Sequence, residues 1–228
     1  NPSDWLKGTG VHINADLPAH PAIVLVAVKP QMMGDAVPNM AHMGGGGTTF
    51  VSVAAGTPIS YFEKTLGAGT PVVRAMPNTP AAVGRGITAI VANEAGAGAL
   101  DMAEELLSAV GQVVRLETES QIDAVTGVSG SGPAYVFHMI ETMAAGGVAQ
   151  GLSPELAMQL AKATVAGAGA LAEDADEDPA QLRINVTSPN GTTQAALEVL
   201  MDEETGFPSL LPRAVAAATR RAKELADG

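Results

Sequence analysis

The sequence predicts an α/β half with a doubly wound parallel sheet, followed by an all-α half. In the first half, strand-like apolar runs alternate with helix-like stretches of about ten residues, which is typical of successive right-handed βαβ units. After Ser120 no strand-like run follows, and apolar residues recur with helical spacing. We therefore place the domains at residues 1–119 and 120–228.

Five segments of the first half are expected to be strands. The segment 23–28 is continuously apolar, which is typical of a strand buried on both faces of a parallel sheet, and we expect it to be the most buried strand. It ends at Lys29-Pro30, where proline fits the first turn of a helix. The other expected strands are 49–53, 72–76, 87–91 and 112–116, and the expected helices are 58–66 and 99–110.

Helices of the second half are predicted near 133–149, 154–173, 190–202 and 208–226, separated by glycine- and proline-containing turns. Aromatic residues make up only 3% of the chain, so alanine and aliphatic side chains must form the core. Small side chains let helices approach closely, and we expect an alanine-rich half packed tightly on itself. The acidic segment 173–178 is interpreted as a solvated loop between helices.

Composition excludes several classes of protein. Among 228 residues, 12 are basic and 24 acidic, and the net charge of −12 disfavours nucleic acids and anionic membranes as partners. The chain has no cysteine for a disulfide, a thiolate zinc site or a thiol nucleophile. It also has no apolar run of the ~20 residues that a membrane helix needs, and we expect a cytoplasmic protein. Because it opens Asn1-Pro2-Ser3 without methionine, we expect a fragment of a longer protein.

Some patterns are interpreted as structural. The four glycines 44–47 lack the Gly-Lys-Ser/Thr ending of a phosphate loop and are expected to link a helix to a strand. Residues 167–172 match the dinucleotide pattern G-x-G-x-x-A, but no strand precedes them, so a helical packing face is expected. The four histidines show no metal-ligand spacing, and no metal site is expected.

Three other segments are placed where ligands bind. Segments 27–31 and 76–80 follow predicted strands, and open α/β sheets bind ligands at the carboxyl ends of their strands. Segment 187–193, Thr-Ser-Pro-Asn-Gly-Thr-Thr, opens a predicted helix, whose free amides and dipole can bind a small anion such as a carboxylate. Simple capping of that helix is the alternative.

These segments resemble the pyrroline-5-carboxylate reductase family. Residues 123–135 are similar to its central segment and 187–193 to its signature, while 27–30 and 78–80 fall in the expected order and spacing. The resemblance covers essentially the whole chain. It implies reduction of a cyclic imine, 1-pyrroline-5-carboxylate, to L-proline with NADPH or NADH, the final step of proline biosynthesis. It also implies a Rossmann-type sheet domain and a helical domain that forms a homodimer, with larger rings of dimers as a further level of assembly.

The resemblance also implies site residues. It places the dinucleotide against Asn1, Ser3, Asn14, Ala27, Val28, Lys29, Pro30, Ala55, Asn78 and Asn185. It places the substrate at Glu119, Ser188, Thr192 and Thr193. Thr193 is the catalytic candidate, because its hydroxyl would contact the ring nitrogen.

The chain departs from the family pattern twice. The first strand and the glycine-rich turn that hold the pyrophosphate are missing from this sequence, and Asn190 stands where the family has glycine. Asparagine tolerates a left-handed backbone better than most residues, so we expect the loop to keep its shape. The choice between NADH and NADPH stays open, because Asp4 opposes a 2′-phosphate near the start of the chain and Ser3 favours it.

Two other functions compete with this one. The first is another reductase with a Rossmann domain and a helical domain, such as a β-hydroxyacid dehydrogenase. That class uses a catalytic lysine in the helical half, and neither Lys162 nor Lys223 lies in a matching motif. The second is a non-catalytic helical dimerisation module.

Overall fold

The computed structural model describes residues 3–226. The chain divides into two compact units, each described here by itself. Unit 1 comprises the residues up to Ala75 together with Ile90–Leu106, and unit 2 comprises Met76–Ala89 together with the residues from Leu107 onward.

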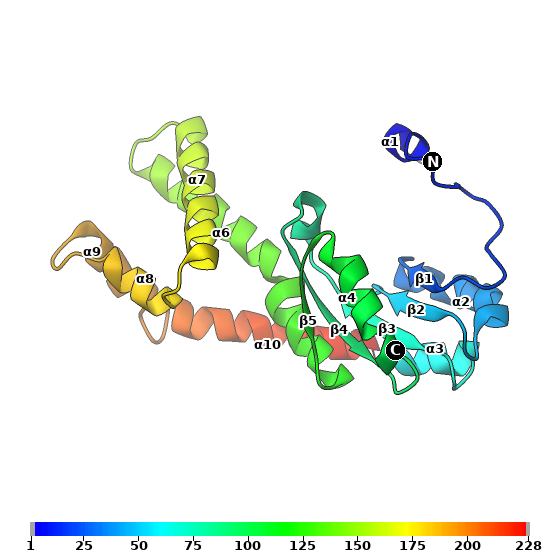
Figure 1. Cartoon of the computed structure of the whole chain (residues 1–228). Helices are drawn as coiled ribbons and strands as arrows, with labels where there is room; N and C mark the ends of the chain where they lie inside the picture. Colours follow the sequence, from blue (N-terminus) through cyan, green and yellow to red (C-terminus); the bar gives the residue numbers. More distant parts are fainter. Residues whose placement is uncertain (1–2, 227–228) are drawn as a thin grey trace. The chain divides into compact units, whose positions relative to one another are not determined.

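One sheet of five strands runs through the described residues (Figure 1), and its spatial order follows the chain order. The strands are β1 (Ile23–Val26), β2 (Thr49–Ser52), β3 (Val72–Met76), β4 (Gly86–Ala92) and β5 (Gly111–Arg115). β1 pairs with β2 in parallel, with Val26 opposite Ser52, and β2 pairs with β3 in parallel, with Ser52 opposite Arg74. All five predicted strands are thus confirmed, although β1 ends at Val26, two residues before its predicted end.

The burial of the strands corrects one prediction. All four residues of β2 are buried, whereas β1 has a single buried residue, Val26, and Leu25 is half exposed. The expectation that 23–28 would be the most buried strand is therefore wrong. The reason is position, since within the described residues β1 pairs only with β2 and lies at the edge of the sheet.

Six helices were predicted, and all six are confirmed with small shifts of their ends. The α-helices are α1 (Asp4–Lys7), α2 (Met33–Ala36), α3 (Ile59–Leu66), α4 (Leu100–Ser108), α5 (Ile122–Val125), α6 (Gly132–Ala149), α7 (Pro154–Asp174), α8 (Pro179–Asn185), α9 (Thr192–Leu200) and α10 (Phe207–Ala226). The 3₁₀ segments are η1 (Pro30–Met32), η2 (Pro38–Met43), η3 (Thr79–Val83), η4 (Ala97–Ala99) and η5 (Glu119–Gln121), and η6 (Thr126–Gly130) is a π-helix.

Sequence reasoning missed the helices α1, α5 and α8 and the π-helix η6, and it gave no bounds for α2. The signal for α8 was present, because Asp178 followed by Pro179 is a typical helix start. The Asp178 Oδ1 atom accepts a hydrogen bond from the Gln181 amide at 2.9 Å. The acidic segment 173–178 is consequently only partly a loop, since α7 extends through Asp174 and Asp178 caps α8.

The two structural interpretations of glycine-containing segments are confirmed. Residues 44–47 form a turn between η2 and β2, and a Cβ atom at Gly44 would lie 2.0 Å from the Leu66 carbonyl oxygen. Residues 167–172 lie inside α7, where no phosphate-binding turn can form.

Unit 1 has an aliphatic and aromatic core in which Phe50, Phe62, Val51, Val72 and Val73 are fully buried. The helical part of unit 2 packs differently. Ala144 on α6 meets Ala157 and Ala161 on α7, with Ile140 and Met158 against them. This contact confirms close packing for α6 and α7 only, because α8, α9 and α10 have no buried residue in the single chain.

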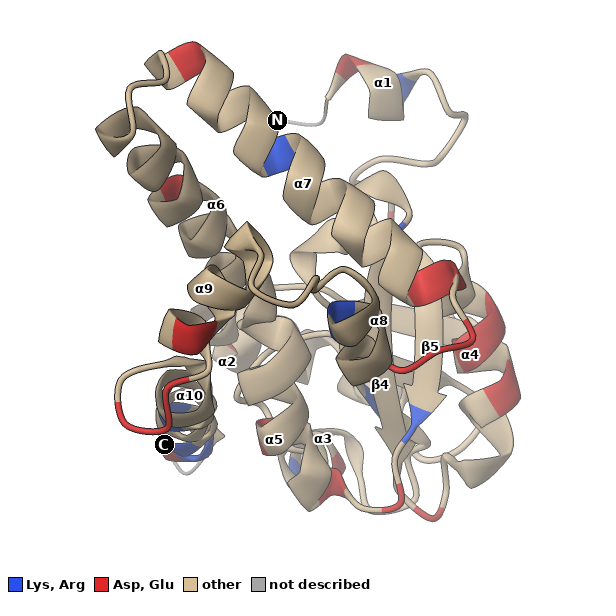
Figure 2. Cartoon of the chain, turned by 90° about the vertical axis from the view of Figure 1, so that its left-hand side faces the viewer, with Lys and Arg blue, Asp and Glu red and all other residues tan. Residues whose placement is uncertain are grey.

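Many large apolar side chains of unit 2 are exposed in the single chain. No residue of α10 is buried, and Phe137 on α6 is 58% exposed. Acidic positions include the end of α7 and the segment leading to α8 (Figure 2). No helix among the described residues is both long and apolar enough to cross a membrane.

Candidate functional site

The carboxyl ends of β1 and β2 lie side by side in unit 1, because Val26 is paired with Ser52. This pairing brings the predicted cofactor segment Ala27–Pro30 next to the loop that contains Ala55. Lys29 is exposed, and within residues 3–226 its ammonium group has no ion-pair partner. An unpaired cation beside small residues at this edge of a parallel sheet is suited to a phosphate-bearing ligand.

The loop after β3 is held by the side chain of Asn78 in unit 2. Its Oδ1 atom accepts a hydrogen bond from the Ile87 amide at 3.0 Å, and its Nδ2 atom donates to the Ser129 carbonyl at 3.2 Å. Pro80 follows in η3, and both Asn78 and Pro80 line a pocket. The segment 76–80 is therefore shaped by contacts with β4 and with η6.

The π-helix η6 forms where glycine is frequent and a proline follows. The Ser131 amide donates to the Thr126 carbonyl at 2.8 Å, five residues back, which is the spacing of a π-turn. The Tyr135 hydroxyl donates to the Gly127 carbonyl at 3.0 Å. Gly127 is buried against α10, since a Cβ atom there would lie 2.3 Å from the Thr219 hydroxyl. Single π-turns occur frequently at functional sites.

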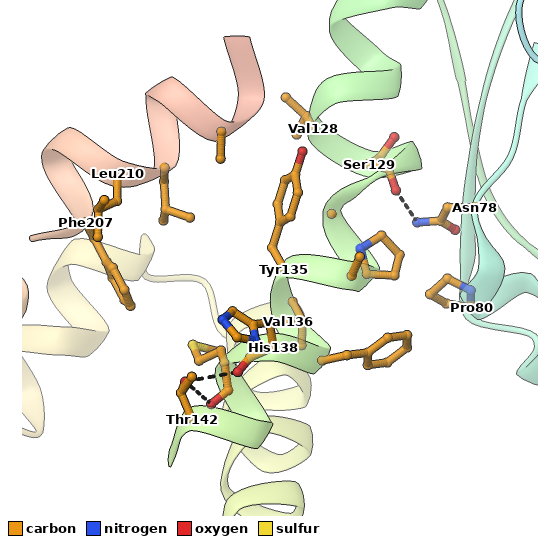
Figure 3. Close-up of a pocket in the computed structure, with 17 residues that line it drawn as sticks. Asn78, Pro80, Val128, Ser129, Tyr135, Val136, His138, Thr142, Phe207 and Leu210 are labelled. Atoms are coloured by element: carbon orange, nitrogen blue, oxygen red, sulfur yellow. Dashed lines mark hydrogen bonds between the residues drawn. The ribbon is translucent and has the colours of Figure 1, made fainter. Parts of the chain in front are cut away.

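An apolar pocket of about 880 Å³ opens beside this π-helix within unit 2 (Figure 3). Its wall comes from η3, η6, α6 and α10, and Figure 3 shows Tyr135, His138 and Phe207 arranged around it. The His138 Nδ1 atom lies 3.1 Å from a Glu141 carboxylate oxygen on the same helix. The pocket offers a largely apolar surface with a few polar groups, which is typical of sites for small organic molecules.

The loop between α8 and α9 has the expected geometry. Asn190 has a φ of 58°, which confirms that asparagine takes the left-handed conformation here. The Gly191 amide donates to the Ser188 carbonyl at 3.0 Å and closes a turn. Gly191 precedes α9 and has no side chain to cap it, so the first amides of the helix, at Thr192 and Thr193, have no intrahelical acceptor.

The remaining predicted residues lie on several elements. Glu119 opens η5, four residues after the end of β5 at Arg115, whereas Ser188, Thr192 and Thr193 lie on the α8–α9 loop and the first turn of α9. The Ser3 hydroxyl accepts from the Leu6 amide at 3.2 Å and caps α1. Asn14 is exposed with a φ of 53°. Asn1 lies outside the described residues.

Asn185 ends α8, and its Oδ1 atom accepts a hydrogen bond from Gln181 Nε2 at 2.8 Å. The structure thus gathers the predicted cofactor residues of the β1 and β2 loops in unit 1 and places Asn78 and Asn185 in unit 2. No group of three or more metal-ligating side chains occurs in the part of the chain that the structure describes.

Comparison with known proteins identifies relatives over almost the whole chain. A family model described as pyrroline-5-carboxylate reductase dimerisation matches residues 119–225. Pyrroline-5-carboxylate reductase of Pseudomonas aeruginosa is 43% identical over 218 residues, which are 95% of this chain and 79% of the relative.

Two solved structures resemble this one closely. A pyrroline-5-carboxylate reductase of Coxiella burnetii superposes with a TM-score of 0.86 at 36% identity, over 91% of this chain and 77% of the other. The pyrroline carboxylate reductase of Plasmodium falciparum, solved with NADP bound, gives a TM-score of 0.80 at 30% identity, over 91% of this chain and 78% of the other.

Proposed function

The chain belongs to the pyrroline-5-carboxylate reductase family, and we propose how its residues perform the reaction of that family. The enzyme reduces 1-pyrroline-5-carboxylate to L-proline with NADPH or NADH, the final step of proline biosynthesis. Its helical half is a dimerisation domain, and the chain forms a homodimer. Family membership excludes a β-hydroxyacid dehydrogenase and a non-catalytic helical module.

The residues at the carboxyl ends of β1 and β2 fit a dinucleotide. Ala27, Val28 and Ala55 present small or aliphatic side chains that allow a flat ring to approach the backbone, and Lys29 supplies a positive charge for a phosphate. Pro30 starts η1, and its ring fixes the backbone at this position. When bound, the nicotinamide cofactor supplies the hydride for the imine carbon, and the protein supplies orientation and electrostatics.

The rest of the proposed cofactor set is Asn1, Ser3, Asn14 and Asn185. Ser3 and Asn14 are exposed polar residues able to bind a ribose hydroxyl or a phosphate. Asn185 at the end of α8 offers an amide from the helical half. Asn78, which the resemblance also implies as a cofactor residue, uses both ends of its side-chain amide in hydrogen bonds within the chain.

The observation that supports the substrate site best is the turn at Asn190. Its left-handed backbone places Gly191 directly before α9, where the amides of Thr192 and Thr193 have no intrahelical acceptor. Such a helix start stabilises a carboxylate, and the Ser188 hydroxyl lies on the same turn. We assign the substrate carboxylate to this turn, and Glu119 completes the proposed substrate set.

Thr193 is the proposed catalytic residue. A protonated imine carries an N–H group, and the Thr193 hydroxyl would accept its hydrogen bond and so orient the ring. A cyclic imine with a pKa near neutrality arrives partly protonated, so the residue beside the nitrogen acts as a hydrogen-bond partner rather than as a strong acid.

The proposal extends to organisation and location. We propose a sheet domain of residues 1–119 and a helical domain of residues 120–228, and the start of the dimerisation match at residue 119 supports this boundary. We expect dimers to assemble further into rings. We also expect the cytoplasm, because a reaction that consumes NADPH or NADH needs a compartment that supplies the reduced cofactor.

A steady-state assay of the full-length protein tests the function. Imine and either NADPH or NADH are supplied, and both cofactor oxidation and proline formation are followed. Proline should form in a one-to-one ratio with oxidised cofactor. Cofactor oxidation without proline, or no turnover with either cofactor, would contradict the assignment.

A further inference from the structure

The side chain of Asn78 joins three segments of unit 2. It lies directly after β3, accepts a hydrogen bond from the Ile87 amide in β4, and donates one to the Ser129 carbonyl in η6. Figure 3 shows the contact with Ser129 at the edge of the apolar pocket. Asn78 is half-buried, and both ends of its amide are therefore used within the chain.

The bond to Ser129 replaces one that the helix cannot make. In an α-helix the Ser129 carbonyl would accept from the amide four residues later, but that residue is Pro133, which has no N–H group. The next amide, that of Ala134, donates to Ser131 at 3.0 Å. The Asn78 Nδ2 atom therefore supplies a donor where the π-turn and the proline leave the backbone short of one.

The fit between η6 and the end of β3 is close. A Cβ atom at Gly130 would lie 2.7 Å from the Met76 Cε atom, the far end of a flexible side chain, so Met76 lies against the backbone of η6. Asn78 and Ser129 both line the pocket, together with Pro80 and Val128 from the same two segments. A change in the Asn78–Ser129 bond would therefore move this part of the pocket wall.

We propose that Asn78 is a positioning residue for the reductase reaction, which holds η6 and the loop after β3 together by donating to the Ser129 carbonyl. The expected effect of Asn78 on kcat rests on the proposed function. It differs from direct cofactor contact, because both ends of the Asn78 side-chain amide are bound within the chain. The loop that it holds follows β3, which runs parallel to β2, and open α/β sheets bind ligands at the carboxyl ends of such strands. Loss of alignment lowers the rate of the chemical step more than it weakens binding.

The variant Asn78→Asp tests this role with a side chain of the same shape. The remaining Oδ1 acceptor can still bind the Ile87 amide, but the donor to Ser129 is replaced by an oxygen that repels the carbonyl. Asn78→Ala, which removes both bonds, is the second variant. Both are compared with the wild-type full-length protein by kcat, KM for the imine, Kd for NADPH, melting temperature, and hydrogen exchange of the amides in residues 126–134.

Asn93→Asp is the matched control. The Asn93 Oδ1 atom accepts from the Val72 and Gly96 amides at 3.0 and 2.8 Å, and its Nδ2 atom donates to Glu63 and to the Thr70 carbonyl. It is thus another half-buried asparagine that joins loops, but it lies in unit 1 and outside the proposed site. Its substitution should lower the melting temperature at least as much as Asn78→Asp does, while kcat per folded molecule stays near the wild-type value.

For Asn78→Asp we expect faster exchange in residues 126–134 and a kcat between about ten- and a hundredfold lower. The Kd for NADPH should stay within about twofold of the wild-type value. Unchanged exchange would show that the Asn78–Ser129 bond does not hold η6. Faster exchange with unchanged kcat would overturn the positioning role. A raised Kd for NADPH as the only kinetic change would make Asn78 a cofactor contact instead.

If the wild-type protein forms no proline with either cofactor, the proposed function fails and the positioning role fails with it. Exchange in residues 126–134 then still shows whether the Asn78–Ser129 bond holds η6. The melting curve shows whether each variant folds. If Asn78→Ala does not fold, the isosteric Asn78→Asp protein alone tests the positioning role.

Discussion

The guanidinium of Arg85 forms an ion pair with the carboxylate of Glu173, which ties the residue before β4 to the last turn of α7. Gln112 Nε2 donates to the other oxygen of the same carboxylate at 3.2 Å. Glu173 thus interacts with two residues that lie 88 and 61 positions away in the chain. Both contacts lie within unit 2.

Substitution of Glu173 should have a small, salt-dependent effect on stability. The side chains of Arg85 and Glu173 are 64% and 45% exposed, and exposed ion pairs contribute about 0–1 kcal/mol. We expect Glu173→Gln to lower the free energy of unfolding within that range at low salt. At about 1 M salt, where screening acts within ~3 Å, the difference should vanish. Urea denaturation at both salt concentrations measures it, and a salt-independent loss would assign the effect to packing.

Gly127→Ala should destabilise the protein by about 1–3 kcal/mol, the usual cost of an extra methyl group in a filled space. A Cβ atom there would lie 2.3 Å from the Thr219 hydroxyl and 2.9 Å from the Val215 carbonyl, which belongs to the backbone and cannot rotate away. Gly98→Ala in η4 is the control, because nothing lies within 4 Å of the new atom. Thermal unfolding of both variants tests the contrast, and equal melting temperatures would contradict it.

Thr193→Ala should lower kcat/KM while cofactor affinity stays nearly unchanged. Loss of one hydrogen bond to the substrate costs ~1–3 kcal/mol, or roughly ten- to a hundredfold in rate. Thr193→Ser keeps the hydroxyl and should retain much of the activity. If Thr193 served only helix formation, both variants would change the melting temperature and leave kcat/KM per folded molecule at the wild-type value, which would remove Thr193 from the catalytic site.

Asp202 should make the turn after α9 sensitive to acid. Its Oδ1 atom accepts from the Thr205 hydroxyl, the Thr205 amide and the Glu204 amide at 2.7, 2.7 and 3.1 Å. The Thr205 side-chain bond and then the two amide bonds hold the pKa of Asp202 below its ordinary value of 3.8.

Because the folded pKa of Asp202 is the lower one, its stabilising effect is present above pH 3.8 and is lost as the pH falls through the folded value. Asp202→Ala should therefore lower the melting temperature at pH 7, and the difference from wild type should shrink as the pH of the comparison falls below 3.8. A difference that grows on acidification would reverse the assigned direction.

The homodimer should be required for folding of the helical half. Leu156 and Leu160 lie one turn apart on α7 and are 44% and 48% exposed in the single chain. Sedimentation at micromolar concentration should show no folded monomer. Replacing both by lysine should weaken the dimer, whereas Leu17→Lys, at a 58% exposed position outside the helical half, should not. A stable helical monomer of the wild type would contradict the prediction.

The sequence by itself determined the order of strands and helices and the family. The predicted strands 49–53 and 72–76 correspond to β2 and β3 almost without shift. The reason is that the spacing of apolar residues and the content of β-branched residues are properties of a few neighbouring positions. The left-handed backbone at Asn190 was likewise predictable, since that preference belongs to the residue type.

Only the tertiary structure decided the burial of each strand and the path of the chain around the pocket. β1 is as apolar as a central strand, yet its burial depends on how many strands pair with it, which no local pattern contains. The π-turn of η6 likewise depends on partners far away in the chain. Asn78 donates to the Ser129 carbonyl, 51 residues away in the chain. At Gly127, α10 packs closer to the backbone than a residue with a Cβ atom would allow. Local sequence sets which conformations a segment prefers, and long-range contacts select among them, because each buried backbone group needs a partner.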